Sequence, residues 1–155
     1  MPRTVSRADV LAFYQAYSRR DLPTVAAFLH EDVHWTVSGP VDVLRYCGER
    51  QNRGEVMHMI TVVIPQMFRE RRFDPEHILI EGDAVAVLAR LTGVQHDGRV
   101  ISYRLAHFVR FRDGKVAALT SIIDSFNAVE QITGRAISLQ PQGAGGEPLD
   151  DLIVI

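Results

Sequence analysis

Three ionisable side chains between residues 99 and 127 have the types and the spacing needed for proton transfer. Tyr103, His107 and Asp124 lie in two apolar runs joined at Asp113-Gly114, a pair typical of a two-residue hairpin turn. If the runs pair there, the three side chains share one otherwise apolar face of a sheet. A histidine in such a place can exchange protons near neutral pH, and a carboxylate beside it can act as an acid or a base. The hairpin therefore predicts a small pocket with acid–base chemistry.

Counting cross-strand partners adds Arg90 to this group. With a second two-residue turn at Asp97-Gly98, Leu105 lies opposite Arg90, and Tyr103 lies opposite Asp124. A bulge or a longer loop would change part of this face, because a slip of one residue exchanges the two sides of a strand. The structural alternatives are a satisfied core histidine and a salt bridge from Arg90 to Asp124. The same count predicts that the pocket wall also includes Leu88, Thr120 and Ile122.

Helices in the first half of the chain supply the cover for this face. Apolar residues recur at helical spacing over 6–20, 21–29 and 54–68, and Pro65 should end or kink the third helix. Tyr14 and Tyr17 lie on the first helix and can reach a cavity under it. Further wall candidates are Trp35, Met59 and Met67.

Strands dominate the second half of the chain. Alternation over 33–37 predicts one early strand, and the segment 38–52 reads as a loop. Four later strands are expected at 73–80, 84–95, 100–112 and 116–126. Helices gathered early and antiparallel strands gathered late predict an α+β fold in which helices cover one face of a bent, mostly antiparallel sheet.

The face opposite the helices is also expected to be apolar. An exposed apolar patch of that extent is unusual on a monomer, so we expect a homodimer through this outer sheet face. The residues assigned to it are Val85, Val87, Ala89, Leu91, Ala106, Phe108, Leu119 and Ile123.

Composition narrows the classes of function. The 155 residues are 46% hydrophobic and 23% charged, which suits one globular core, and the net charge of −2 offers no basic field for a nucleic acid. A single cysteine excludes an internal disulfide, no HExxH arrangement is present, and we expect neither a metal nor a cofactor. No apolar run approaches the length of a membrane span, and the charged N-terminus does not resemble a signal peptide. We therefore expect a cytoplasmic protein with no membrane partner.

The end of the chain differs in kind from the rest. Residues 1–139 form the expected domain, whereas 140–148 read as a Gly/Pro-rich linker leading to the apolar sequence LDDLIVI. Leaving four terminal apolar residues in water is costly. We expect this arm, within 140–155, to dock as an added strand or over a partner subunit.

Three segments resemble a known family: DVHWTVSGP, GDAVAVLARLTG and the hairpin AHFVRFRDGKV followed by SIIDSFN. Together with the order of elements, they are similar to the SnoaL-like branch of the NTF2-like superfamily, over roughly residues 6–133. This group includes ketosteroid isomerases, limonene epoxide hydrolase, scytalone dehydratase and polyketide cyclases. The resemblance implies an NTF2-like cone-shaped barrel in which three helices and a bent sheet enclose a deep pocket, usually in a dimer.

Transfer of the family's site residues is incomplete. The isomerases carry a carboxylate base just after the first strand, but residues 37–40 contain none and only Asp42 is near. Their oxyanion-hole acid matches His107, and their first-helix tyrosine matches Tyr14 or Tyr17. The dehydratase's histidine and tyrosines resemble His107, Tyr103 and Tyr17. In the epoxide hydrolases an Asp-Arg-Asp set holds a water, and Arg90 with Asp124 resembles part of it.

These observations predict a SnoaL-like protein with a small-molecule ligand in its pocket. The leading hypothesis is a cofactor-independent lyase or isomerase for a small, partly apolar carbonyl or hydroxyl compound, with His107 and Asp124 as acid–base groups and Arg90 and Tyr103 as orienting groups. One alternative is a non-catalytic ligand-binding or dimeric interaction module, and another is an epoxide hydrolase-like enzyme.

Overall fold

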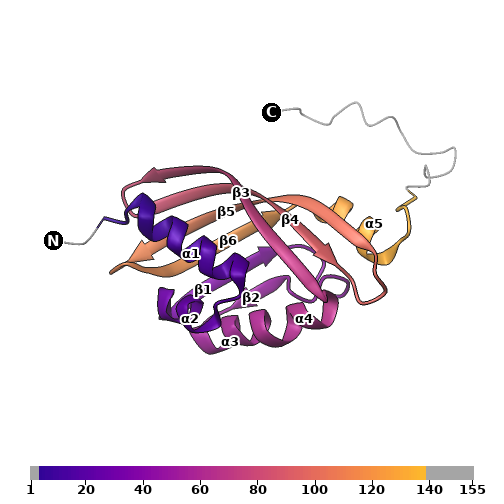
Figure 1. Cartoon of the computed structure of the whole chain (residues 1–155), viewed down its shortest axis with the longest axis horizontal. Helices are drawn as coiled ribbons and strands as arrows, with labels where there is room; N and C mark the ends of the chain where they lie inside the picture. Colours follow the sequence, from indigo (N-terminus) through magenta and orange to yellow (C-terminus); the bar gives the residue numbers. More distant parts are fainter. Residues whose placement is uncertain (1–3, 139–155) are drawn as a thin grey trace, which may run out of the picture.

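The computed structural model describes residues 4–138, which form one curled, open sheet with helices packed on its concave face (Figure 1). The α+β fold class is thus confirmed. The helical segments are α1 (Arg7–Arg19), α2 (Leu22–Phe28), α3 (Arg53–His58), the π-helix η1 (Met59–Val63), α4 (Ile64–Met67) and α5 (Ser125–Thr133). The strands are β1 (Leu29–Ser38), β2 (Gly48–Arg50), β3 (Glu70–Glu81), β4 (Ala84–Val94), β5 (Val100–Arg112) and β6 (Lys115–Ile123).

Local sequence signals start the first two helices. Ser6 caps α1 in a reciprocal capping box with Asp9, in which each side chain accepts from the other residue's backbone N–H. Asp21 caps α2 by accepting from Thr24 N–H, and Pro23 occupies its first turn, where a missing N–H costs nothing. Both helices begin where the sequence predicts them.

The third helix continues through Pro65 instead of ending there. Ile64 N–H donates to the carbonyl of Met59, five residues back, and this wider turn is part of the π-helix η1. The lack of an N–H on Pro65 removes one ordinary α-helical bond at this position. Residues 53–67 therefore form one continuous helical rod, α3–η1–α4, with a widened middle.

The strand order is β2-β1-β6-β5-β4-β3, and every neighbouring pair is antiparallel except β1 with β6. Two elements were not expected: β2 lies within the predicted loop 38–52, and α5 replaces the end of the strand predicted to run to 126. Pro75 fits within β3 because this strand is at the sheet edge and has a register shift there.

The expected cross-strand register is wrong on both sides of β5. Tyr103 pairs with Leu91, because the 95–99 turn places three residues between the paired Gln95 and Arg99. On the other side, a bulge at Ala117 shifts β6 by one residue relative to the Asp-Gly turn. Each slip moves the neighbouring strand's side chains to the opposite face.

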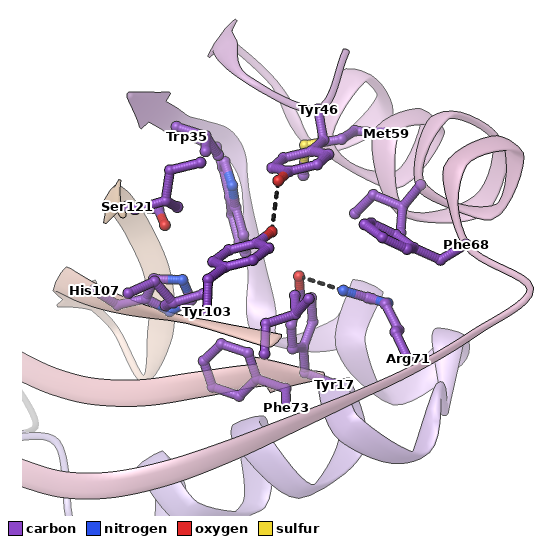
Figure 2. A pocket seen from close by; sticks show the side chains of 15 residues that line it. Tyr17, Trp35, Tyr46, Met59, Phe68, Arg71, Phe73, Tyr103, His107 and Ser121 are labelled. Atoms are coloured by element: carbon purple, nitrogen blue, oxygen red, sulfur yellow. Dashed lines mark hydrogen bonds between the residues drawn. The ribbon is translucent and has the colours of Figure 1, made fainter. Parts of the chain in front are cut away.

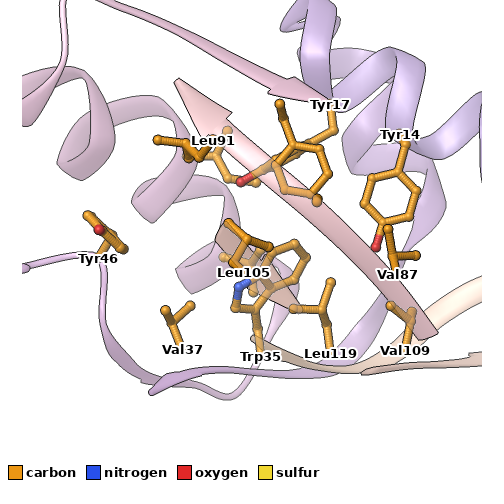
Figure 3. Close-up of a cluster of buried hydrophobic side chains, with 14 of the residues drawn as sticks. Tyr14, Tyr17, Trp35, Val37, Tyr46, Val87, Leu91, Leu105, Val109 and Leu119 are labelled. Atoms are coloured by element: carbon orange, nitrogen blue, oxygen red, sulfur yellow. The ribbon is translucent and has the colours of Figure 1, made fainter. Parts of the chain in front are cut away.

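Because of these register shifts, the residues on the outer face of the sheet differ from those predicted. Of its eight residues, only Ala106 and Phe108 lie outside, whereas the other six are buried under the helices. The interior side of the sheet includes Val87, Leu91, Leu105 and Val109, which gather with Tyr14 and Trp35 in one core (Figure 3). The outer face exposes Phe108 and Ile122, and a homodimer through it remains a prediction.

The predicted domain boundary at 139/140 and the docking of the apolar arm lie outside the described residues. Within residues 4–138, no helix is long and apolar enough to cross a membrane.

Candidate functional site

A partly open pocket lies between the concave face of the sheet, α1 and the α3–η1–α4 rod (Figure 2). Its cavity volume is about 40 Å³, well below the roughly 150 Å³ of an engineered apolar cavity that binds benzene. A ring-sized ligand therefore requires the walls to move. The lining side chains are Tyr17, Trp35, Val37, Tyr46, Met59, Ile64, Phe68, Arg71, Phe73, Leu91, Tyr103, Leu105, His107, Ser121 and Ile123.

His107 is the buried histidine of this wall. Its ring stacks on Phe73 at a centroid distance of 5.1 Å and meets Trp35 edge to face at 6.4 Å. Complete burial lowers the pKa of His107 to about 3, because the apolar surroundings disfavour the charged ring. The imidazole is therefore neutral at physiological pH.

Tyr14 fixes the protonation pattern of this imidazole. The Tyr14 hydroxyl lies 2.9 Å from His107 Nδ1, and no other hydrogen bond of that hydroxyl is found within residues 4–138. If Nδ1 carried the proton, the hydroxyl hydrogen of Tyr14, which does not line this cavity, would have no acceptor, at a cost of about 1–3 kcal/mol. In the other tautomer the Nε2–H belongs to His107, which does line the cavity, and can meet a water or ligand atom there. Tyr14 therefore donates to Nδ1, and the ring proton is on Nε2. Burial also raises the pKa of Tyr14, so the tyrosine stays protonated.

Two tyrosine hydroxyl groups form another hydrogen bond at the cavity wall. Tyr46 and Tyr103 are joined oxygen to oxygen at 2.5 Å, as the dashed line in Figure 2 shows. Burial raises the pKa of both phenols, which keeps them neutral. Because one hydroxyl donates to the other, the acceptor's own hydrogen has no partner within the described chain and can be offered to a ligand.

Arg71 brings a positive charge to the pocket. Its Nη1 donates to the Tyr17 hydroxyl at 2.8 Å, and its guanidinium lies 4.5 Å from the centroid of the Tyr17 ring. Among the described residues no carboxylate lies within ion-pair distance of Arg71, and its buried Nη2 has no hydrogen-bond partner. The buried indole Nε1 of Trp35 also lacks a partner there. The pocket thus holds unused donors, and none of its described lining residues is acidic.

The structure brings five of the predicted site residues to the pocket wall: His107, Tyr103, Tyr17, Trp35 and Met59. Tyr14 is buried next to His107 but is not among the lining residues. Met67 is partly buried against the core and does not line the cavity.

The other predicted site residues lie elsewhere, because the register differs from the expected one. Arg90, Leu88, Thr120 and Ile122 face the outer side of the sheet, where Arg90 pairs with Glu76 at 3.4 Å. Asp124 is exposed and accepts from Asn127 N–H as the N-cap of α5. The predicted Arg90–Asp124 salt bridge does not form.

Sequence reasoning missed several lining residues, among them Arg71, Tyr46 and Ser121. Arg71 carried a usable signal, since it lies two residues before the buried Phe73 and therefore on the same face of β3. Ser121 depends on the β6 bulge, which places it opposite His107. Tyr46 lies in an irregular segment with no periodic signal. No group of three or more possible metal ligands occurs within 4–138.

Comparison with known proteins identifies the protein family. The model of the SnoaL-like domain family matches residues 10–119, and the chain therefore belongs to the SnoaL-like family. No curated protein matches the sequence.

Solved structures of similar fold include other NTF2-like proteins. An NTF2-like protein of unknown function from Burkholderia pseudomallei has a TM-score of 0.75 and 28% identity, covering 81% of this chain and 95% of its own. A candidate isomerase from Rhodopseudomonas palustris has a TM-score of 0.71 and 28% identity, covering 81% and 93%. An LEH-like epoxide hydrolase from M. tuberculosis shares the fold at a TM-score of 0.67 and 14% identity, covering 82% and 88%.

Proposed function

We propose that this SnoaL-like protein is a cofactor-independent isomerase or lyase for a small, partly apolar carbonyl compound. The carrying observation is the neutral His107 on the pocket wall, whose Nδ1 is bonded to Tyr14. This arrangement leaves Nε2–H as a donor for a substrate oxygen. The similarity to a candidate isomerase supports the same class.

His107 acts in this proposal as a neutral electrophile. A hydrogen bond from Nε2–H stabilises the negative charge that grows on a carbonyl oxygen as the neighbouring carbon loses a proton. A solvent water that enters the partly open pocket with the substrate accepts that proton and returns one at the other end of the enolate. The net reaction moves one proton within the substrate and consumes no other reactant.

The absence of a carboxylate among the described lining residues favours a second candidate, a non-catalytic ligand-binding protein. The two functions differ in whether carbon-bound protons exchange. An epoxide hydrolase-like reaction is not supported, because Arg90 and Asp124 lie on the outer surface.

Proton exchange at carbon can be measured without knowing the natural substrate. Cyclic ketones such as 2-tetralone are incubated with the protein in D2O, and loss of the α-proton signal is followed by NMR. We expect exchange faster than in buffer and a loss of about 100-fold or more in His107→Leu, which removes the Nε2–H donor. Arg90→Gln, on the outer face, is the matched control and should retain the wild-type rate.

Two outcomes would overturn the catalytic proposal. One is a wild-type rate equal to that of buffer across a panel of ketones, and the other is an unchanged rate in His107→Leu. Saturable ligand binding without exchange would establish the non-catalytic alternative.

A further inference from the structure

The donors left unused in the pocket indicate what kind of ligand it accepts. Arg71 is a cation whose described contacts are neutral: the Tyr17 hydroxyl and the Tyr17 ring. Several other arginines of the described chain have acidic partners, such as Arg72 with Asp74 and Arg90 with Glu76. Arg71 therefore has a charge that the surrounding protein does not neutralise.

Trp35 supplies an independent observation. Its side chain is 2% exposed and lines the cavity, yet its Nε1–H has no acceptor within residues 4–138. A buried donor without an acceptor is destabilising, so an acceptor atom brought by a ligand would be stabilising. Trp35 and Arg71 both contact Tyr17, with ring centroids of Trp35 and Tyr17 at 6.3 Å.

The shape and chemistry of the wall complete the description. The aromatic rings of Phe73, Phe68 and Tyr103 line the same cavity, so the body of the ligand meets flat apolar surfaces (Figure 2). None of the described lining residues is an Asp or Glu that would repel an anion. We infer that the pocket recognises a small, planar, monoanionic carboxylate, with Arg71 binding the carboxylate and Trp35 Nε1 donating to an acceptor oxygen.

This inference names the substrate class of the proposed enzyme and rests on the same pocket. The narrow cavity requires one wall to move for a ring to bind, and the adaptable Met59 begins the π-helix η1 at that wall. The carboxylate class differs from an uncharged carbonyl compound only in carrying an additional anionic group for Arg71.

Binding of benzoate and of its neutral isostere benzamide tests the charge requirement. Trp35 is the sole tryptophan of the chain, so its fluorescence reports directly on this pocket, and calorimetry gives an independent affinity. We expect saturable benzoate binding at least about tenfold tighter than that of benzamide, since a hydrogen bond from arginine to a carboxylate is stronger than one to a neutral amide oxygen. In Arg71→Gln the preference should disappear, and Arg71→Lys should retain part of it.

Arg72→Gln is the matched control, because it removes an equal charge one residue away on the exposed side of β3. It should keep the preference for benzoate. Equal affinity for the two ligands, no saturable response to benzoate, or unchanged benzoate affinity in a folded Arg71→Gln would overturn the inference. Binding is measured without turnover, so failure of the ketone exchange assay alone leaves the charge preference standing, and loss of the preference alone leaves the exchange chemistry standing.

Discussion

The two faces of the sheet differ in the partners of their arginine side chains, which are acidic on the outer face and neutral on the inner face. On the outer face, Arg90 and Arg104 share Glu76 at 3.4 and 3.5 Å, in contact with solvent. On the inner face, Arg71 reaches only the hydroxyl and ring of Tyr17 among described partners. Ion pairs at a surface are worth little and their geometry is easily replaced. A pocket-lining cation without an acidic partner is costly to maintain, and it is therefore the more informative of the two about function.

The same contrast holds for the residues expected to move protons. Asp124 lies on the surface, where its carboxylate caps α5, whereas His107 is enclosed by Phe73, Trp35 and Tyr14. Burial lowers the pKa of His107. Asp124 is exposed, and its carboxylate serves as the N-cap of α5.

Lowering the pH should reduce the unfolding free energy of the protein, because His107 is buried in its neutral form. Its pKa in the fold is about 3, below the ordinary value of 6.5, so between these values the unfolded chain binds a proton that the native state does not. The stability that depends on neutral His107 is complete above pH 6.5 and is lost as the pH falls toward 3. We expect His107→Gln to flatten the pH dependence of the unfolding free energy by up to about 1.4 kcal/mol per pH unit in this range, measured by urea denaturation. Parallel wild-type and variant curves would contradict the buried, neutral state of His107.

Removing the carboxylate of Asp124 should remove the N-cap hydrogen bond of α5. We expect Asp124→Ala to lower the unfolding free energy by about 1 kcal/mol, because Asn127 N–H loses its acceptor. Asp124→Asn is the discriminating variant, since asparagine is an equally good N-cap but cannot take up a proton as a base. Full stability and full exchange activity in Asp124→Asn support the structural role, and loss of activity with retained stability would restore a chemical one.

Arg90→Gln should have the smallest effect. Its partner Glu76 retains Arg104, and a solvent-exposed pair of this kind contributes below about 1 kcal/mol. Benzoate affinity should also stay unchanged, in contrast to Arg71→Gln. A loss of ligand preference in Arg90→Gln would mean that charge on either face affects the pocket, and the distinction between the two faces would fail.

Local rules were enough to predict much of the architecture. The capping box at Ser6, Pro23 at the start of α2 and the alternation in β4 and β5 depend on neighbours in sequence, and these elements form as expected. The missed elements depend on distant contacts. The short β2 exists by pairing with β1, and α5 packs against β5, where Gln131 accepts from Ser102 N–H.

The sequence places Tyr103 and His107 on the same side of β5, because an even spacing on one strand preserves the face whatever the neighbouring strands do. It also determined the family, through patterns distributed over residues 10–119. Which residues accompany that pair depends instead on how the neighbouring strands pair in the folded protein. A three-residue turn after Gln95 and a bulge at Ala117 each shift the register by one position, so that Ala89 replaces Arg90 opposite Leu105 and Ser121 replaces Thr120 opposite His107. Such slips depend on how the sheet curls around its core, which no short stretch of sequence specifies.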